Sequence, residues 1–204
     1  MFEDRGSNFY EKGVSLVEII VAIFIIAMFS AILISDFPRI LRQFALSRAS
    51  YTLAQDLRKA EDLGLSGVQI EDDGRNKIQA KGYGVYINLV NNTQYIIYAD
   101  RGELPDSQYD GTEQFCSNES SDFDKDCILE IVQLSLENKS LYIKDIKNIS
   151  GQSVSINFTP PGPTVEITER LAGSIKIGIV LGLMTDKNKD RTIWVNTAGL
   201  VEVN

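Results

Sequence analysis

The feature that most constrains this chain is an unbroken apolar run near its N-terminus. Residues 14–35 read VSLVEIIVAIFIIAMFSAILIS, and Glu18 is the one charged residue among them. At about 1.5 Å per residue, a helix of this length extends roughly 33 Å, enough to cross a hydrocarbon core of about 30 Å. The alternative is a core helix of a soluble domain, but such a helix is seldom apolar on every face. The run therefore predicts a membrane-spanning helix over residues 14–35.

The residues before this run do not read as a secretory signal peptide. Such a peptide has a basic start, a shorter apolar stretch and small residues at a cleavage site after that stretch. Here residues 1–13, MFEDRGSNFYEKG, form a polar leader, and Asp36-Phe37-Pro38 follows the apolar run. A carboxylate inside a membrane helix is costly. Glu18 therefore either has a function there or lies within reach of headgroups and water.

Residues 13–18, GVSLVE, followed by a long apolar helix, resemble the N-terminal signal of type IV pilins and type II secretion pseudopilins. In that family a prepilin peptidase cuts after the Gly and methylates the new N-terminal amine. The resemblance implies a cut between Gly13 and Val14, which makes Glu18 the fifth residue of the mature chain. It further implies that Glu18 pairs with the N-terminal amine of a neighbouring subunit in an apolar filament core and so sets the axial register, because a mutual pair is tolerated where a single buried charge is not.

After the apolar run, the pattern becomes that of an amphipathic helix. Pro38 predicts a kink, and residues 36–66 are expected to continue the helix to about Leu63, with Gly64 and Gly67 ending it. The apolar stripe of this segment consists of Leu46, Ala49, Leu53, Leu57 and Ala60.

Residues 67–204 have the pattern of a β-rich head. Strands are predicted at residues 83–90, 94–99, 128–134, 141–146, 154–158, 164–168, 175–181 and 192–196. Turn residues lie between these runs, and Asn91-Asn92 resembles a hairpin turn, so antiparallel pairing is expected. The predicted fold class is therefore α+β, with a long N-terminal helix, membrane-spanning in its first half, packed on an antiparallel head in a pilin-like layout.

The C-terminal third carries a second, weaker resemblance. Residues 157–162, NFTPPG, and residues 193–201, IWVNTAGLV, are similar to the strand and turn pattern of H-type minor pseudopilins and FimT-like pilins. Ordinary hairpins of any β-rich head fit these short motifs nearly as well.

The composition excludes several kinds of chemistry. The chain has no His, which removes Ser-His-Asp, Cys-His and His-zinc sites. Its net charge of -8 has the wrong sign for neutralising phosphates, so broad nucleic-acid binding is not expected. Cys116 and Cys127 are too few for a zinc site, but in an oxidising compartment they can close a small disulfide loop.

Two acidic clusters have oxygen ligands at alternate positions, a spacing that can coordinate calcium. They consist of Asp122, Asp124 and Asp126, and of Asp186, Asn188 and Asp190. Neither cluster has the Gly and the distal Glu of a full EF-hand loop, so solvated turns are the preferred interpretation. Apart from calcium, no cofactor is expected.

The leading functional hypothesis is a structural, minor subunit of a type IV pilus, a type II secretion pseudopilus or a competence filament. Its expected partners are prepilin peptidase, other pilin or pseudopilin subunits and the membrane. It would be a single-pass protein of the cytoplasmic membrane, with its N-terminus inside and its head outside, before it joins an extracytoplasmic filament. The alternative is a singly anchored surface domain that binds sugar, protein or calcium without polymerising. An enzyme is not predicted, because nothing in the sequence places an acid and a base together.

Overall fold

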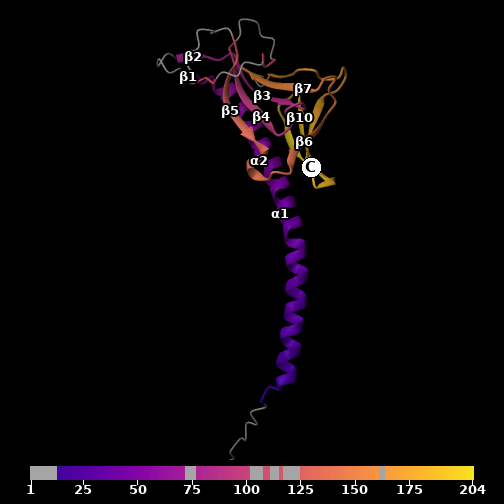
Figure 1. The fold of residues 1–204 in the computed structure, drawn as a ribbon. Helices are drawn as coiled ribbons and strands as arrows, with labels where there is room; N and C mark the ends of the chain where they lie inside the picture. Colours follow the sequence, from indigo (N-terminus) through magenta and orange to yellow (C-terminus); the bar gives the residue numbers. More distant parts are fainter. Residues whose placement is uncertain (1–12, 72–76, 102–107, 111–114, 117–124, 161–163) are drawn as a thin grey trace, which may run out of the picture. The chain divides into compact units, whose positions relative to one another are not determined.

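The computed structural model describes residues 13–71, 77–101, 108–110, 115–116, 125–160 and 164–204. The chain divides into two compact units, Met1–Leu41 and Arg42–Asn204. One helix, α1 (Leu16–Ser66), contributes residues to both units (Figure 1). The prediction of a long N-terminal helix is therefore confirmed.

The helix α1 passes through Pro38 without interruption and ends at Ser66. Gly67 follows with a φ of 57°, a left-handed conformation that terminates helices and that Gly adopts at little cost. The prediction that Gly64 also ends the helix is wrong. Gly64 is a buried helical residue, and a Cβ atom at this position would lie 2.5 Å from the carbonyl oxygen of Phe158. Gly64 therefore allows α1 and a neighbouring strand to approach closely.

Antiparallel sheets make up most of the second unit. Its strands are β1 (Gln69–Glu71), β2 (Lys77–Gln79), β3 (Gly82–Asn88), β4 (Gln94–Asp100), β5 (Cys127–Gln133), β6 (Leu141–Lys147), β7 (Ser153–Thr159), β8 (Thr164–Ile167), β9 (Lys176–Leu183), β10 (Asp186–Asn196) and β11 (Val201–Val203). A one-turn helix, α2 (Leu134–Glu137), follows β5 directly. Among the described residues, β5-β4-β3-β7-β8 form one sheet, β11-β10-β9-β6 form another, and β1 pairs with β2.

All eight predicted strands are present, with ends shifted by a few residues. The turn at Asn91-Asn92 joins the antiparallel strands β3 and β4, as the sequence predicts. The sequence did not reveal β1, β2, β11, α2 or the first half of β10. These elements are short or polar, and backbone pairing with a neighbour holds the strands among them in place. The α+β fold class with an antiparallel head is confirmed.

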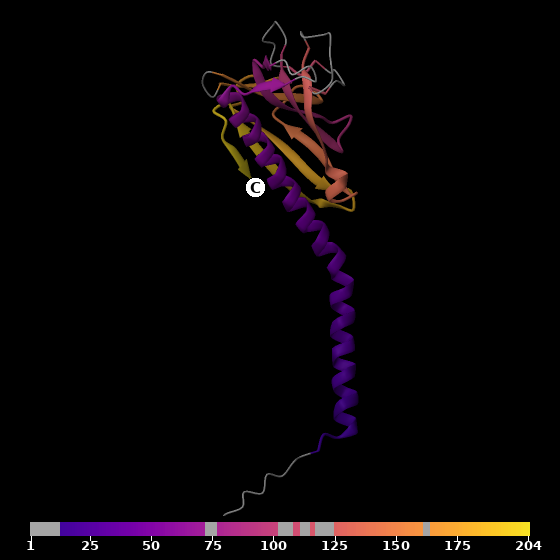
Figure 2. The ribbon, with the colours of Figure 1, turned by 90° about the vertical axis from the view of Figure 1, so that its left-hand side faces the viewer.

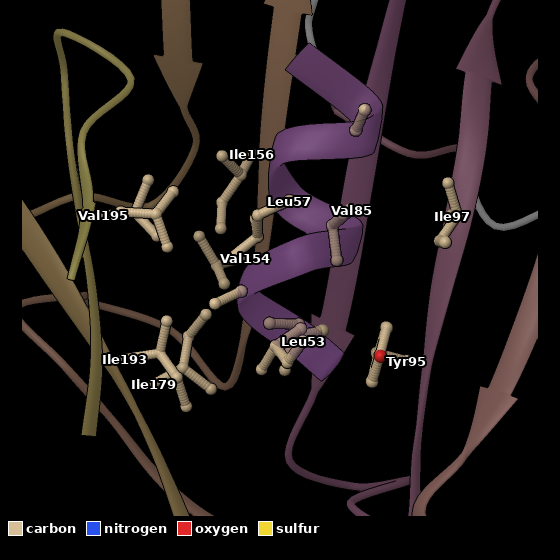
Figure 3. Packing of buried hydrophobic residues seen from close by; sticks show 14 of the residues in the cluster. Leu53, Leu57, Val85, Tyr95, Ile97, Val154, Ile156, Ile179, Ile193 and Val195 are labelled. Carbon is tan, nitrogen blue, oxygen red and sulfur yellow. The ribbon is translucent and has the colours of Figure 1, made fainter. Parts of the chain in front are cut away.

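The core of the second unit is formed by buried side chains from the two large sheets and from the second half of α1. Figures 1 and 2 show this half of the helix beside the strands. Figure 3 shows Leu53 and Leu57 of α1 among buried side chains from both sheets. The labelled neighbours are Val85, Tyr95, Ile97, Val154 and Ile156 from the five-stranded sheet, and Ile179, Ile193 and Val195 from the four-stranded sheet. The predicted stripe from Leu46 to Ala60 is the face of the helix that is buried there.

Polar contacts also join this half of α1 to the sheets. The Tyr95 hydroxyl donates a hydrogen bond of 2.5 Å to Asp56. Burial raises the pKa of Asp56, although the hydrogen bond from Tyr95 opposes that shift. The Arg58 guanidinium donates to the Val201 carbonyl at 3.3 Å. A side chain of β4 and the backbone of β11 therefore hold two different sides of the helix.

Candidate functional site

The predicted cleavage bond lies immediately before α1. Gly13 and Val14 are exposed and outside regular structure, and the helix begins at Leu16. A Cβ atom on Gly13 would meet no heavy atom within 4 Å. The first twelve residues of the leader lie outside the described residues. In the described part of the chain, the bond between Gly13 and Val14 is thus open to an approaching enzyme.

The first turn of α1 positions Glu18. The backbone N–H groups of Glu18 and Ile19 donate to the Ser15 carbonyl at 3.0 and 3.3 Å. A carboxylate in the first turn interacts favourably with the partial positive charge of a helix N-terminus. The Glu18 side chain is exposed, and the ion pairs found among the described residues do not include it. Its carboxylate is therefore available to a charge outside the chain.

The helix beyond Glu18 presents apolar side chains in every direction. This part of the helix is long and apolar enough to cross a membrane, and none of it is buried within the chain. Large side chains such as Phe24 and Leu33 are 65% and 71% exposed. The polar Ser30 hydroxyl is satisfied within the helix, because it donates to the Ile26 carbonyl at 2.8 Å. This surface is far more apolar than a soluble monomer leaves open to water.

Comparison with known proteins places this segment in a class. A family model described as the prokaryotic N-terminal methylation motif matches residues 8–34. The matched residues include Gly13, Val14, Glu18 and most of the apolar run. The N-terminus of this chain therefore carries a type IV pilin or pseudopilin signal, and the motif implies processing by prepilin peptidase and assembly with other pilin subunits. Together with the apolar helix, it indicates a single-pass anchor in the inner membrane.

Searches among curated proteins and among solved structures found no match to the chain. The family match ends at residue 34, before the β-rich head. The similarity of the head to H-type minor pseudopilins and FimT-like pilins therefore stays a prediction.

The two cysteines lie at the edge of the five-stranded sheet. A disulfide joins Cys116 to Cys127, the first residue of β5, and both residues are buried. The Cys116 N–H also donates to the Ile128 carbonyl at 2.9 Å. The disulfide thus holds a loop segment against β5.

The first acidic cluster is only partly visible, because Asp122 and Asp124 lie outside the described residues. Asp126 is 4% exposed, so the interpretation of a solvated turn is wrong for this residue. Its carboxylate accepts hydrogen bonds from the backbone N–H groups of Arg101 at 3.4 Å and of Asp110 at 3.2 Å. Burial, followed by the nearby charges of Asp100 and Asp110, raises the pKa of Asp126 to about 7.

The strands predicted at residues 175–181 and 192–196 place the second acidic cluster between them. In the structure, the cluster lies inside strand β10. The register of β10 against β9 shifts between Asp186 and Asp190, which indicates a bulge there. The Lys144 ammonium contacts the Asp190 carboxylate at 2.9 Å and donates to the Lys187 carbonyl at 3.0 Å. Asp190 is thus already paired with a cation. Within the described ranges, no three His, Cys, Asp or Glu side chains are grouped so that they could hold a metal ion.

Proposed function

We propose that this protein is a minor structural subunit of a type IV pilus, a type II secretion pseudopilus or a competence filament. Residues 1–13 are the leader that prepilin peptidase removes, and Val14 becomes the methylated N-terminus. Residues 14–35 span the membrane, with the N-terminus inside, residues 36–66 continue the helix, and residues 67–204 form the head outside. The subunit has no catalytic role.

The observation that carries this proposal is the position of Glu18 within the matched motif. It is a carboxylate at the start of an apolar run, residues 14–35, that has no other charge, and it lies one helical turn from the amine that cleavage creates at Val14. When such helices pack together without water, a carboxylate and an ammonium from neighbouring chains stabilise each other, while each alone is strongly unfavourable. Pairing of Glu18 with the neighbour's amine therefore sets the axial register between adjacent helices.

The test is the Glu18→Leu variant. Leu retains helix propensity and favours insertion, so the amount of protein in membranes should be unchanged or higher. Removing one partner of a buried pair costs about 3 to 5 kcal/mol, so the ratio of protein in sheared filaments to protein in membranes should fall by more than about tenfold. Glu18→Asp, which retains the charge, should lose less.

The matched control is Asp36→Leu, which removes a carboxylate from the same helix outside the motif. Its filament ratio should stay close to that of the wild type. Mass spectrometry of each extracted chain checks that processing still begins the mature chain at methylated Val14. An unchanged ratio for correctly processed Glu18→Leu protein would contradict the role of Glu18. Absence of even the wild type from filaments would favour the singly anchored surface domain instead.

A further inference from the structure

The five-stranded sheet carries a second apolar cluster on the face opposite α1. Along β3 and β4, alternate residues such as Val85 and Ile97 enter the main core, so their neighbours in sequence face the other way. On that outer face lie Tyr86, Ile96, Tyr98, Ile128 and Ile131, together with Tyr109 from outside the sheet. Register pairs Tyr86 with Ile96, and Ile96 with Ile131, so three adjacent strands contribute to one surface.

A cavity of about 540 Å³ lies on this surface, near the turn between β3 and β4. This volume falls within the range of about 300 to 1,000 Å³ that is usual for small-molecule sites. Its walls include the rings of Tyr86, Tyr109 and Phe115. The Tyr86 and Tyr109 ring centroids are 4.9 Å apart, and their planes are tilted by 40°. The two rings thus support each other along the wall of the cavity.

Neutral polar groups complete the described lining. The Asn88 amide donates to the Tyr86 hydroxyl oxygen at 3.1 Å, which leaves the Tyr86 proton for another acceptor. Asn91 and Gln94 add two carboxamides, each with a donor and an acceptor. None of the described residues that line the cavity carries a charge. The site therefore combines aromatic faces with uncharged donors and acceptors.

We propose that this cavity binds a neutral carbohydrate, as a short oligosaccharide of pyranose rings. The C–H faces of a sugar ring match aromatic faces, and its many hydroxyl groups match carboxamides and a tyrosine hydroxyl, which both donate and accept. A charged ligand would lose hydration on entry without gaining a counter-charge from the described lining. The net charge of -8 further disfavours anionic polymers.

Isothermal titration calorimetry of the full mature chain in phospholipid nanodiscs tests the proposal. Detergents with maltose or glucose headgroups are avoided, because they would compete for the cavity. The probes are chitotriose, maltotriose and cellotriose, with a capped proline-rich decapeptide as a ligand of another class. We expect saturable binding of at least one trisaccharide and none of the peptide.

Two conservative variants locate that binding. Tyr86→Phe removes the hydroxyl but retains the ring, and Gln94→Ala removes one half-buried carboxamide. Each should weaken binding by about threefold to tenfold, the usual effect of one hydrogen bond, and the double variant should weaken it further. The matched controls are Tyr142→Phe and Gln152→Ala, which lie outside the cavity and should bind as the wild type does.

Unchanged unfolding midpoints and near-ultraviolet circular dichroism establish that all five variants, the double variant included, are folded. No saturable binding of any of the three sugars would overturn the proposal. Sugar binding that Tyr86→Phe and Gln94→Ala leave unchanged would overturn it as well, and so would binding of the peptide alone.

Discussion

The two halves of α1 share one helix but differ in what surrounds them. Leu33 in the first half is 71% exposed, whereas Leu57 in the second half is 0% exposed. In the first half, apolar residues occupy every face, so no single protein surface could cover them all. In the second half, they form one stripe, which the two sheets bury. The distribution of apolar residues around the helix, more than their number, therefore indicates whether a single surface of the same chain can cover them.

The two halves of α1 should differ most in how much a Leu to Ala substitution lowers the free energy of unfolding. Leu57→Ala creates a cavity in the core and should lower the free energy of unfolding by about 2 to 5 kcal/mol. Leu33→Ala should change it by less than about 0.5 kcal/mol, because the head does not bury Leu33. Denaturant unfolding of the full chain in detergent, followed by Trp194 fluorescence, measures both. Equal losses for the two variants would contradict the comparison.

The close approach of Phe158 to Gly64 should make a Gly to Ala change destabilising, although such a change normally stabilises a helix. Gly to Ala inside an exposed helix normally stabilises by about 1 kcal/mol. In Gly64→Ala, the new Cβ atom meets the backbone of Phe158, which cannot rotate away as a side chain can, so a loss of about 1 to 3 kcal/mol is expected. The exposed Gln55→Ala serves as a control within the same half of α1. A gain in stability for Gly64→Ala would show that helix and strand can separate at little cost.

Buried Asp126 should make the stability of the second unit depend on pH. Its pKa rises from 3.8 to about 7 on folding, so the folded state holds the proton more tightly. The stabilisation is fully present below about pH 4 and is lost as the pH rises through about 7. Because one pKa unit corresponds to about 1.4 kcal/mol, the wild type should be at least that much less stable at pH 8 than at pH 5. Asp56 is expected to shift stability in the same direction.

The Asp126→Asn variant isolates this contribution, because Asn resembles the protonated acid. Chemical unfolding of the variant should show a smaller difference between pH 5 and pH 8. A pH dependence equal to that of the wild type would assign the effect to other carboxylates.

The smallest effect should come from the exposed ion pair between α1 and β5. Lys59 and Glu130 lie 3.0 Å apart, with side chains 55% and 52% exposed. Exposed pairs contribute about 0 to 1 kcal/mol, and salt screens them. A double-mutant cycle of Lys59→Met and Glu130→Gln should give a coupling free energy in that range, which 1 M salt removes. A larger coupling would show that polar contacts, and not only the apolar stripe, hold the helix in the head.

The N-terminal signal could be recognised from the sequence because it is local, and the family match to residues 8–34 supports it. Gly13, Val14 and Glu18 belong to a linear motif, and the apolar run that follows needs no tertiary contact to be recognised; cleavage after Gly13 stays a prediction. The eight main strands were also predictable, since runs of β-branched and aromatic residues end at turn residues. The first half of β10 was not, because residues 186–191, DKNKDR, show no alternation and are extended through pairing with β9.

Features that depend on distant segments could not be read from the chain. The buried Asp126 accepts hydrogen bonds from the backbone of Arg101 and Asp110, and nothing in the sequence indicates that these residues lie close to it. The sequence alone predicts that Gly64 ends the helix, because the close approach of Phe158 is visible only in the structure. The sequence contains one indication of the cavity. Residues 83–87 and 95–99, YGVYI and YIIYA, are apolar at consecutive positions, as expected of strands whose sheet is buried on both faces. The positions of Tyr109 and Phe115 against that face could not be predicted, because they depend on tertiary contacts.

The order of the strands in the two large sheets has a consequence for how the chain folds during synthesis. The chain makes β3, β4 and β5 of one sheet, then β6 of the other, returns to the first for β7 and β8, and completes the second with β9, β10 and β11. The five-stranded sheet has all its strands once β8 is made, whereas the four-stranded sheet needs the last strands, β9 to β11. The apolar stripe of α1 is synthesised early, but its packing partners include residues as late in the chain as Val195 and Val201. Contacts so distant in sequence favour slow folding. Until those strands are made, the apolar stripe of α1 has only part of the cover that the finished fold gives it.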